Sequence, residues 1–437
     1  MTADKKHKAP AALRVAVCDL NGVARGKRLP ATDAAAQQKK ASQDALRMPL
    51  SVSTVDIWGR DIENSKMIFE SGDADGICRP LRDEILPAPW LGPNAGTIPA
   101  WMFNESGDPS EVDPRHALAR VVQRYANKEL TPVVATELEF YLTPASEQST
   151  AFLSEGVLSL HQLDTVSPLL DDIYTACAAQ GIPADAAISE CGPGQFEINL
   201  LHRDDALLAA DDAVFFKQIV KGYARQHGYI ANFMAKPDGT AAGSGLHLHF
   251  SLLNKDGENV FDDNSTEGSE TLKSAVAGVL AAMVESTLVF APHYNSYRRL
   301  QPASHAPTTV CWGYENRTAA IRIPGGSNKA RRLEHRVAGA DANPYLVMAA
   351  VLGAAFEGIE KKLSPPAPIT GNAYKSDATA LPGQWATAIA AFENGSMVSD
   401  IFSQQLRQVY IQLKQQELLR FAEQVSPFEY TSYAEQV

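Results

Sequence analysis

The chain has little of what marks secreted, membrane-spanning or nucleic-acid-binding proteins. Its five cysteines are scattered without a CxxC pair, which is typical of reduced thiols in a cytosolic protein. Residues 1–10 are charged and have no apolar core, so they do not resemble a signal peptide. The longest apolar run, residues 345–356, is too short to cross a bilayer. The net charge of −12 disfavours nucleic acid as the main partner. We therefore expect a cytoplasmic protein without membrane or nucleic-acid partners.

The composition is that of a globular protein, and the length indicates more than one unit. The chain has 437 residues, of which 45% are hydrophobic and 21% charged, so we expect one large domain and a smaller one. Residues 80–99 contain several prolines and are interpreted as a linker. Asp113 followed by Pro114 predicts the start of a helix. We therefore place the domains at 1–110 and 111–437.

Strands and helices alternate along the larger domain without regular βαβ spacing. This pattern favours an α+β fold with an antiparallel or mixed sheet. Helices are expected at residues 114–127, 168–181, 206–228, 270–290 and 344–362.

Several predicted strands carry polar side chains on one face and apolar side chains on the other. Side chains of a strand alternate with period two. A sheet that packs its apolar face on helices would therefore gather the polar groups in one concavity. The strands and their polar residues are 133–142 with Glu137 and Glu139, 195–200 with Glu197 and Asn199, 246–252 with His247, His249 and Ser251, and 332–337 with Arg332, Glu334 and Arg336.

Acidic residues dominate one part of this expected concavity. Glu137 and Glu139 lie two apart on one strand face, where their charges repel unless a cation or proton intervenes. Taken alone, this pair is more typical of an exposed strand edge or a salt bridge. Together with Glu190, Glu197, His247 and Glu334, it predicts sites for two divalent cations, and oxygen-rich ligation suits Mg²⁺ or Mn²⁺.

Arginines form the second part. In an acidic protein, seven of them lie between residues 298 and 336, and six of these suggest a clamp for a polyphosphate and for a substrate carboxylate. Ordinary salt bridging remains an alternative for several of them. The glycine-rich loop at Gly243 leads into a strand, so it is neither a Rossmann nor a P-loop motif. Metals and an arginine cage together indicate phosphoryl transfer. The six arginines are Arg298, Arg299, Arg317, Arg322, Arg332 and Arg336.

Five strings carry a resemblance to the glutamine synthetase superfamily along nearly the whole chain. They are TELEFY at 136–141, GPGQFEINL at 192–200, GSGLHLH at 243–249, NRTAAIRIP at 316–324 and KARRLEHRVAGADANPYL at 329–346. Within the superfamily, the chain looks most like the glutamate–amine ligases of the γ-glutamylputrescine (polyamine) synthetase type. The strings that mark this branch are at 19–30, 73–80, 233–237 and 295–299.

The resemblance implies the fold and the assembly. It implies a small N-terminal β-grasp domain and a catalytic domain with a curved antiparallel sheet flanked by helices. It also implies a homo-oligomer of stacked rings, a dodecamer, with active sites between neighbouring subunits.

The resemblance also implies roles for individual residues. One metal would be held by Glu139, Glu190 and Glu197, and the other by Glu137, His247 and Glu334. ATP is the implied co-substrate, with Arg317, Arg322 and Arg332 at its phosphates and His249, Ser251 and Lys329 near it. Glutamate would bind Arg299, Arg336 and Gly243. Asp56, Arg299, His305 and Arg317 are the candidate catalytic residues.

The sequence departs from ordinary glutamine synthetases where that family binds ammonium. The ammonium-binding Asp-Gly-Ser-Ser string is replaced by Asp56-Ile57-Trp58-Gly59, an expected Asn is Ala242, and the flap Glu is His305. The stretch between Glu139 and Glu190 is also short. We therefore expect an ATP-dependent ligase that joins glutamate, through a γ-glutamyl phosphate, to an organic amine.

Which amine is used stays open between putrescine or another polyamine and a small monoamine such as methylamine. Three alternatives remain at this point. They are a glutamine synthetase that uses ammonium, a catalytically silent structural or regulatory relative, and a guanidino kinase with a similar catalytic domain.

Overall fold

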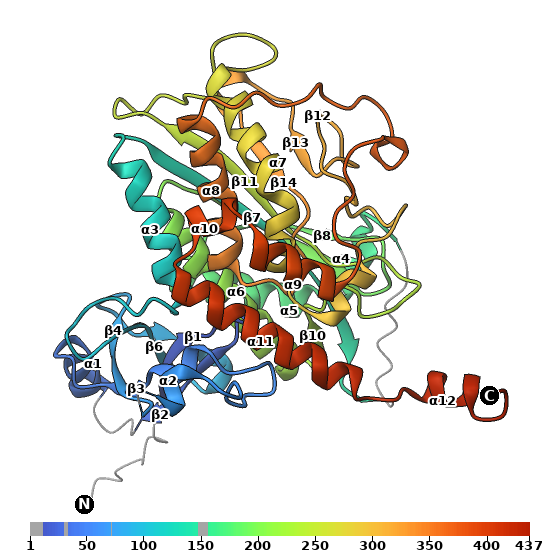
Figure 1. The fold of residues 1–437 in the computed structure, drawn as a ribbon. Coiled ribbons are helices and arrows are strands. Elements are labelled where there is room, and N and C mark those ends of the chain that lie inside the picture. Colours follow the sequence, from blue (N-terminus) through green and yellow to red (C-terminus); the bar gives the residue numbers. More distant parts are fainter. Residues whose placement is uncertain (1–11, 30–33, 71, 147–155) are drawn as a thin grey trace, which may run out of the picture.

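Two separate β-sheets organise the chain (Figure 1). The structure, a computed structural model, describes residues 12–29, 34–70, 72–146 and 156–437. Helix α3 (Pro114–Ala126) lies between the two sheets in the sequence and begins where it was predicted. The Asp113 carboxylate accepts a hydrogen bond of 2.8 Å from the backbone N–H of Arg115, which caps the first turn.

The N-terminal sheet has six strands in the order β2-β1-β6-β4-β3, with β5 paired to β6. β1 runs parallel to β6, and the other pairs are antiparallel. The elements are β1 (Leu13–Cys18), β2 (Ala24–Leu29), α1 (Ala34–Ser42), β3 (Arg47–Pro49), α2 (Lys66–Phe69), β4 (Asp75–Pro80), β5 (Leu86–Pro87) and β6 (Gly96–Phe103).

The interpretation of residues 80–99 as a linker was wrong. This segment holds β5 and the start of β6, which pairs with three other strands. A proline in a strand removes one backbone donor but keeps its acceptor. Pro99 lies inside β6, and its carbonyl accepts a hydrogen bond of 2.8 Å from the N–H of Leu81. The prolines are therefore compatible with the sheet.

The second sheet has eight strands in the order β12-β13-β14-β11-β7-β9-β8, with β10 paired to β7. All pairs are antiparallel except β12 with β13, so the sheet is mixed rather than purely antiparallel. Its strands are β7 (Thr131–Pro144), β8 (Ala184–Ser189), β9 (Gln195–Arg203), β10 (Tyr229–Asn232), β11 (Leu246–Leu253), β12 (Trp312–Tyr314), β13 (Ile321–Ile323) and β14 (Leu333–His335).

The predicted strand at 332–337 is shorter than expected. β14 covers only Leu333–His335, so Arg332 and Arg336 flank the strand instead of lying in it. The expected alternation is confirmed on β7, where Val134, Leu138 and Phe140 are fully buried on one face.

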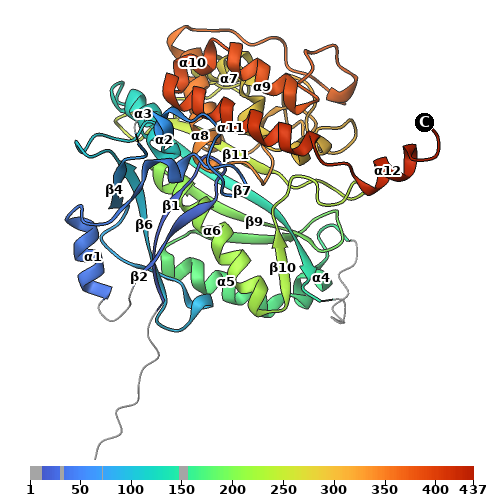
Figure 2. The same ribbon diagram turned by 60° about the horizontal axis from the view of Figure 1, so that its bottom comes forward.

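Helices cover the apolar face of this sheet: α6 packs on β7, β9 and β10, α3 packs on β7, and α8 packs on α3, α6 and α7 (Figure 2). Their bounds are α4 (Leu160–Thr165), α5 (Ser167–Gln180), α6 (Ala206–Gln226), α7 (Glu270–Phe290), α8 (Pro344–Glu360), α9 (Trp385–Asn394), α10 (Met397–Ile401), α11 (Gln404–Ala422) and α12 (Pro427–Tyr433).

α7 is apolar and long enough to span a membrane, with a mean hydropathy of 1.5 over its most apolar window, but 78% of that window is buried inside the protein. It crosses α8 very closely. A Cβ on Gly278 would lie 2.1 Å from the carbonyl oxygen of Ala354, and one on Gly358 would lie 2.1 Å from that of Ser274. Only glycines fit at this crossing, so α7 is a helix of the protein core.

The C-terminal helix α11 connects the two halves of the chain through a buried ionic cluster. The Lys414 ammonium donates to the Asn21 side chain at 2.5 Å and to the Glu417 carboxylate at 3.0 Å. Glu417 also accepts hydrogen bonds from the Asn21 amide at 3.0 Å and from the backbone N–H of Ile57 at 2.7 Å. Lys414 and Glu417 are fully buried, so each charge depends on the other.

We expect Lys414→Ala to lower the free energy of unfolding by about 3–5 kcal/mol, because it leaves the Glu417 carboxylate buried without its cation. Lys128→Ala is the control, since Lys128 makes a solvent-exposed ion pair with Glu360. Urea unfolding followed by circular dichroism measures both. Equal effects of the two substitutions would contradict a structural role for the buried pair.

Candidate active site

The register of the second sheet brings the predicted metal ligands together. Glu139 lies directly across from Glu197 on β9, and Glu137 lies across from His247 on β11. One strand further, Glu334 of β14 pairs with His249 of β11 and with Arg322 of β13. The polar concavity expected from the alternation is therefore present.

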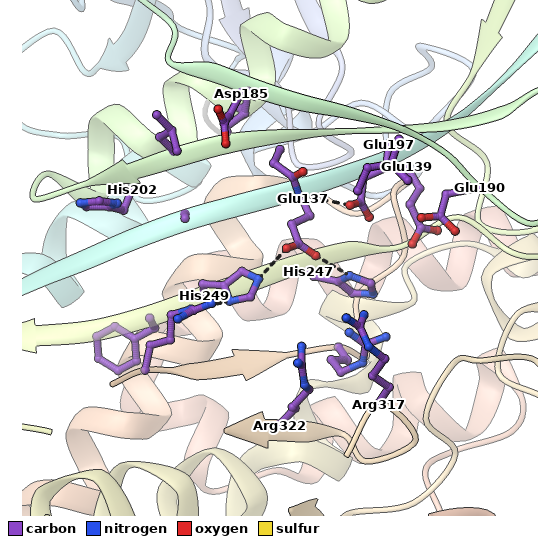
Figure 3. A pocket seen from close by; sticks show the side chains of 18 of the residues that line it. Glu137, Glu139, Asp185, Glu190, Glu197, His202, His247, His249, Arg317 and Arg322 are labelled. Atoms are coloured by element: carbon purple, nitrogen blue, oxygen red, sulfur yellow. Dashed lines mark hydrogen bonds and ion pairs between the residues drawn. The ribbon is translucent and has the colours of Figure 1, made fainter. Parts of the chain in front are cut away.

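These groups line one large cavity of about 1220 Å³. Every predicted site residue is part of its wall except Asp56, Arg298 and Glu334. Arg298 is exposed, and its guanidinium lies 5.7 Å from the centre of the Tyr294 ring, so its predicted place in the clamp was wrong. Glu334 lies just behind the wall with 1% of its surface exposed. Figure 3 shows Glu139, Glu190 and Glu197 gathered at one end, with Arg317 and Arg322 facing the acids.

The acidic end is electrostatically strained. Burial, and then the charges of neighbouring glutamates, raise the pKa of Glu190 to about 7 and that of Glu197 to about 9. Two side-chain amides contact these acids: Asn199 donates to Glu197 at 3.1 Å, and Gln195 donates to Glu139 at 3.4 Å. A neutral amide relieves little of the like-charge repulsion, so the cluster is built to take up cations or protons.

Two sets of donor atoms fit a divalent cation. The ligand atoms of Glu137, His247 and Glu334 lie within 4.8 Å of one another, and so do those of Glu139, Glu197 and His247. Carboxylate oxygens with one imidazole nitrogen suit a hard divalent ion. Glu190 was expected in the second set, but His247 takes that place in the geometry, and Glu190 lies beside it on the cavity wall.

Glu137 is held between two histidines. His247 Nδ1 lies 3.1 Å from one carboxylate oxygen of Glu137, and His249 Nε2 lies 2.9 Å from the other. Burial would raise the pKa of Glu137, but the hydrogen bonds from the two imidazoles outweigh it and keep that pKa well below its usual range. The Arg332 Nε–H donates to His249 Nδ1 at 3.2 Å, so His249 carries its proton on Nε2 and donates it to Glu137.

Glu334 is paired with two of the predicted arginines. Arg322 Nη1 lies 2.8 Å from its Oε2, and Arg336 Nη1 donates to its Oε1. Burial alone would raise the pKa of Glu334. The nearby positive charges, of which Arg336 has the largest effect, outweigh burial and lower this pKa to about 2. Glu334 is therefore a carboxylate at neutral pH and available as a ligand.

Arg299 is positioned by its backbone contacts. Its guanidinium donates to the carbonyl oxygens of Val337 at 2.7 Å and of Arg336 at 3.3 Å. A Cβ on Gly243 would lie 2.7 Å from Arg299 Cγ, so the glycine is needed for this close approach. Gly243 and Arg299 thus share one corner of the cavity.

Asp56 does not join the site. It is completely buried in the N-terminal half, where it accepts hydrogen bonds from the backbone N–H groups of Trp58 at 3.0 Å and Arg60 at 2.8 Å, and from the Gln416 amide at 3.0 Å. Its carboxylate shapes the loop, and the exposed group of that loop is Trp58, which packs on Phe421 with ring centroids 5.5 Å apart.

Other residues of the wall were not predicted. Gln195 precedes Glu197 by two positions and donates to the carbonyl oxygen of Gly243 at 3.0 Å, so the same period-two reading could have found it. Glu315 lies outside the cavity wall but pairs with Arg322, with 3.0 Å between its Oε2 and Arg322 Nη2, and it follows a three-residue strand without any sequence signal. Val157 and Leu158 also line the cavity.

Comparisons with known proteins agree with this geometry. Residues 111–433 match the model of the glutamine synthetase catalytic domain. The γ-glutamylputrescine synthetase PuuA of Escherichia coli is 38% identical over 420 residues, which cover 93% of this chain and 88% of the relative. The glutamate–isopropylamine ligase of a Pseudomonas species is 32% identical over 437 residues, covering 96% and 94%.

A third relative and a solved structure are also similar to this chain. The γ-glutamylethanolamide synthetase GlnA4 of Streptomyces coelicolor is 35% identical over 362 residues, covering 78% of this chain and 75% of the relative. A structure of GmaS in complex with ADP superposes with a TM-score of 0.84 at 27% identity and covers 97% of this chain and 96% of that one.

We expect the affinity for Mn²⁺ to rise with pH. The raised pKa values of Glu190, about 7, and Glu197, about 9, mean that protons occupy these carboxyls until a cation displaces them. The carboxyls lose these protons as the pH rises through those values. A cation then no longer has to displace a proton, so its binding free energy becomes more favourable. Calorimetric titration at pH 6 and pH 8 should give at least about a tenfold difference in affinity, with about one proton or more released per ion at the lower pH. Affinity independent of pH would contradict the assignment of these two acids.

Proposed function

Because the chain belongs to the glutamine synthetase family, we propose that it uses ATP to join the γ-carboxylate of glutamate to an organic amine. It is a glutamate–amine ligase. The observation that carries this conclusion is the cavity itself, in which a carboxylate cluster faces several arginines. The named relatives, which act with different amines, support the same reaction class.

The residues of the cavity divide between the substrates. We assign Arg317, Arg322 and Arg332 to the phosphates of ATP, with His249, Ser251 and Lys329 beside the nucleotide. We assign Arg299, Arg336 and Gly243 to glutamate. Six side chains would hold two Mg²⁺ or Mn²⁺ ions, namely Glu137, Glu139, Glu190, Glu197, His247 and Glu334.

The reaction has two steps. An oxygen of the glutamate γ-carboxylate attacks the γ-phosphorus of ATP and releases ADP, which leaves an acyl phosphate. The nitrogen of the amine then attacks the acyl carbon and expels phosphate, and the amine loses a proton. Divalent cations held by the six acidic and histidine side chains would supply charge neutralisation at the phosphates. Arg317 and Arg322 lie on the opposite wall, where their charges stabilise the same oxygens.

The second step needs a proton acceptor, because only a neutral amine is nucleophilic. We assign this role to His305, which lines the cavity. Ala303 and His305 have φ values of +62° and +61°, a conformation that costs free energy for residues other than glycine. Such local strain is typical of segments whose side chains are held for function.

We also propose how the chain is organised beyond this cavity. Residues 1–110 would be the β-grasp domain and 111–437 the catalytic domain, in a homo-oligomer of stacked rings. The fixed loop around Asp56 would then reach the neighbouring subunit's site, where Trp58, not the buried Asp56 carboxylate, meets the substrate. All five cysteines are free thiols, which supports a cytoplasmic location.

A panel of amines tests the proposed reaction. With ATP, glutamate and Mg²⁺ or Mn²⁺, we expect organic amines to accelerate the release of phosphate well above the rate with ammonium. Each rate is compared with a control without glutamate. Strict preference for ammonium would make the protein a glutamine synthetase, and the absence of turnover with every amine would favour a silent relative. Phosphate transfer to a guanidine without glutamate would instead indicate a guanidino kinase.

We expect Glu197→Ala to lower turnover by at least about 100-fold while the protein stays folded. Its carboxyl is disfavoured in the ionised form by burial, so removing it relieves repulsion instead of breaking a stabilising contact. The matched control is Glu393→Ala, because Glu393 is an exposed acid of α9 outside the cavity. Steady-state rates and melting curves measure both effects. Unchanged activity in Glu197→Ala would remove Glu197 from the cation site.

A further inference from the structure

The cavity has an apolar wall next to its acidic end, and nothing in the steps above uses it. Val157 and Leu158 line the cavity, and they are 58% and 71% exposed. Exposed apolar side chains that face a binding cavity are typical of a site for an apolar group of a ligand.

The backbone fixes this wall beside Glu190. The N–H of Leu158 donates to the carbonyl oxygen of Ser189 at 2.8 Å, and the Ser189 hydroxyl donates to that of Gly156 at 2.6 Å. Glu190 follows Ser189 directly. The two apolar side chains are therefore anchored at the end of β8, one residue away from an acid of the cluster.

The conformation of Leu158 is unusual. Its φ is +57°, in the left-handed region that leucine rarely adopts. The two hydrogen bonds at Ser189 hold the segment in this form. An exposed leucine in a strained backbone is costly without a ligand, so both features point to the same use of the side chain.

Part of the cavity is already assigned: Arg299, Arg336 and Gly243 would hold glutamate, and the basic residues near Ser251 would hold ATP. Of the unassigned apolar side chains in the described lining, Val157 and Leu158 are the most exposed, ahead of Leu201 with 47%. They also lie beside Glu190, so we expect the incoming amine to pass them, with Trp58 of the neighbouring subunit as a further contact.

The charge of the wall then selects the amine. Apart from the cluster itself, the acidic residues of the described lining are Asp185 and Asp204. Figure 3 places Asp185 toward His202, at the opposite end of the cavity from Glu190, and Asp204 follows His202 by two residues. Among the described residues, a second ammonium group against Val157 and Leu158 would find only acids of the cluster, which the cations would occupy, so it would lose water without a free partner there.

We propose that the acceptor is a primary monoamine whose substituent is apolar and lies against Val157 and Leu158. This inference rests on the proposed function and narrows it. It separates the chain from an enzyme for diamines, although one relative is named for putrescine and another for isopropylamine. Apolar contact with a wall of two side chains favours each buried methylene by about fourfold.

A matched pair of substrates tests the proposal. n-Butylamine and 1,4-diaminobutane have the same carbon chain and differ in the distal ammonium. With full-length protein, ATP, glutamate and Mg²⁺, we expect kcat/KM, corrected for the fraction of neutral attacking amine, to be at least about tenfold higher for n-butylamine. Equal or better use of 1,4-diaminobutane would overturn the proposal and leave the ligase function intact. If none of the tested amines supported turnover, the proposed function itself would be overturned.

Two substitutions locate the effect on the wall. Leu158→Ala should lower kcat/KM for n-butylamine by about tenfold and leave that for methylamine nearly unchanged. Leu158→Asp should move the preference toward 1,4-diaminobutane, because it supplies a partner for the distal ammonium. The control is Leu160→Ala, since Leu160 is 74% exposed in the same segment but does not line the cavity. Melting curves show whether the variants fold.

The pattern across these variants decides the outcome. A loss in Leu158→Ala that is equal for both amines, or equal to the loss in Leu160→Ala, would overturn the assignment of the wall. A selective loss for n-butylamine supports it.

Discussion

The repulsion among buried carboxylates is the constraint on which the rest of this site depends. The pairing of β7 with β9 places Glu139 across from Glu197, and neither strand can shift without moving its apolar residues out of the core. Glu190 joins them from the end of β8. Such a cluster is unfavourable in a protein by itself. Packing elsewhere in the protein offsets this free-energy cost, above all the packing of the helices behind the sheet.

Opposite charges on the facing wall complete the arrangement. Arg322 and Arg336 both pair with Glu334, and Arg332 acts through His249 on Glu137. Each acid on this side therefore has a cationic partner, while Glu190 and Glu197 have none of comparable strength among the described residues. Divalent cations held by the acids would neutralise the negative oxygens of a substrate lying between the two walls. This asymmetry is consistent with the ATP that we propose as co-substrate.

The sequence was sufficient for those parts that depend on local periodicity. Alternation predicted which face of β7 carries Glu137 and Glu139, and Asp113 with Pro114 marked the start of α3. The sequence was insufficient where contacts with distant segments determine the position of a side chain. The burial of Asp56 had no local signal, because it depends on Gln416 of helix α11, which lies 360 positions away. Likewise, no local pattern distinguishes Leu158 from Leu160, because only the hydrogen bonds at Ser189 turn one of them toward the cavity.

Activation and selection use different kinds of structure in this protein. The groups that would activate glutamate lie mainly on paired strands, where register fixes them. The groups that would meet the amine lie on irregular segments, Leu158 at its substituent and His305 as its proton acceptor, and both residues have positive φ. Irregular segments change side chains with little effect on a sheet. A common activation site with an exchangeable amine wall therefore accounts for relatives that share most of this chain yet are named for putrescine, ethanolamide and isopropylamine.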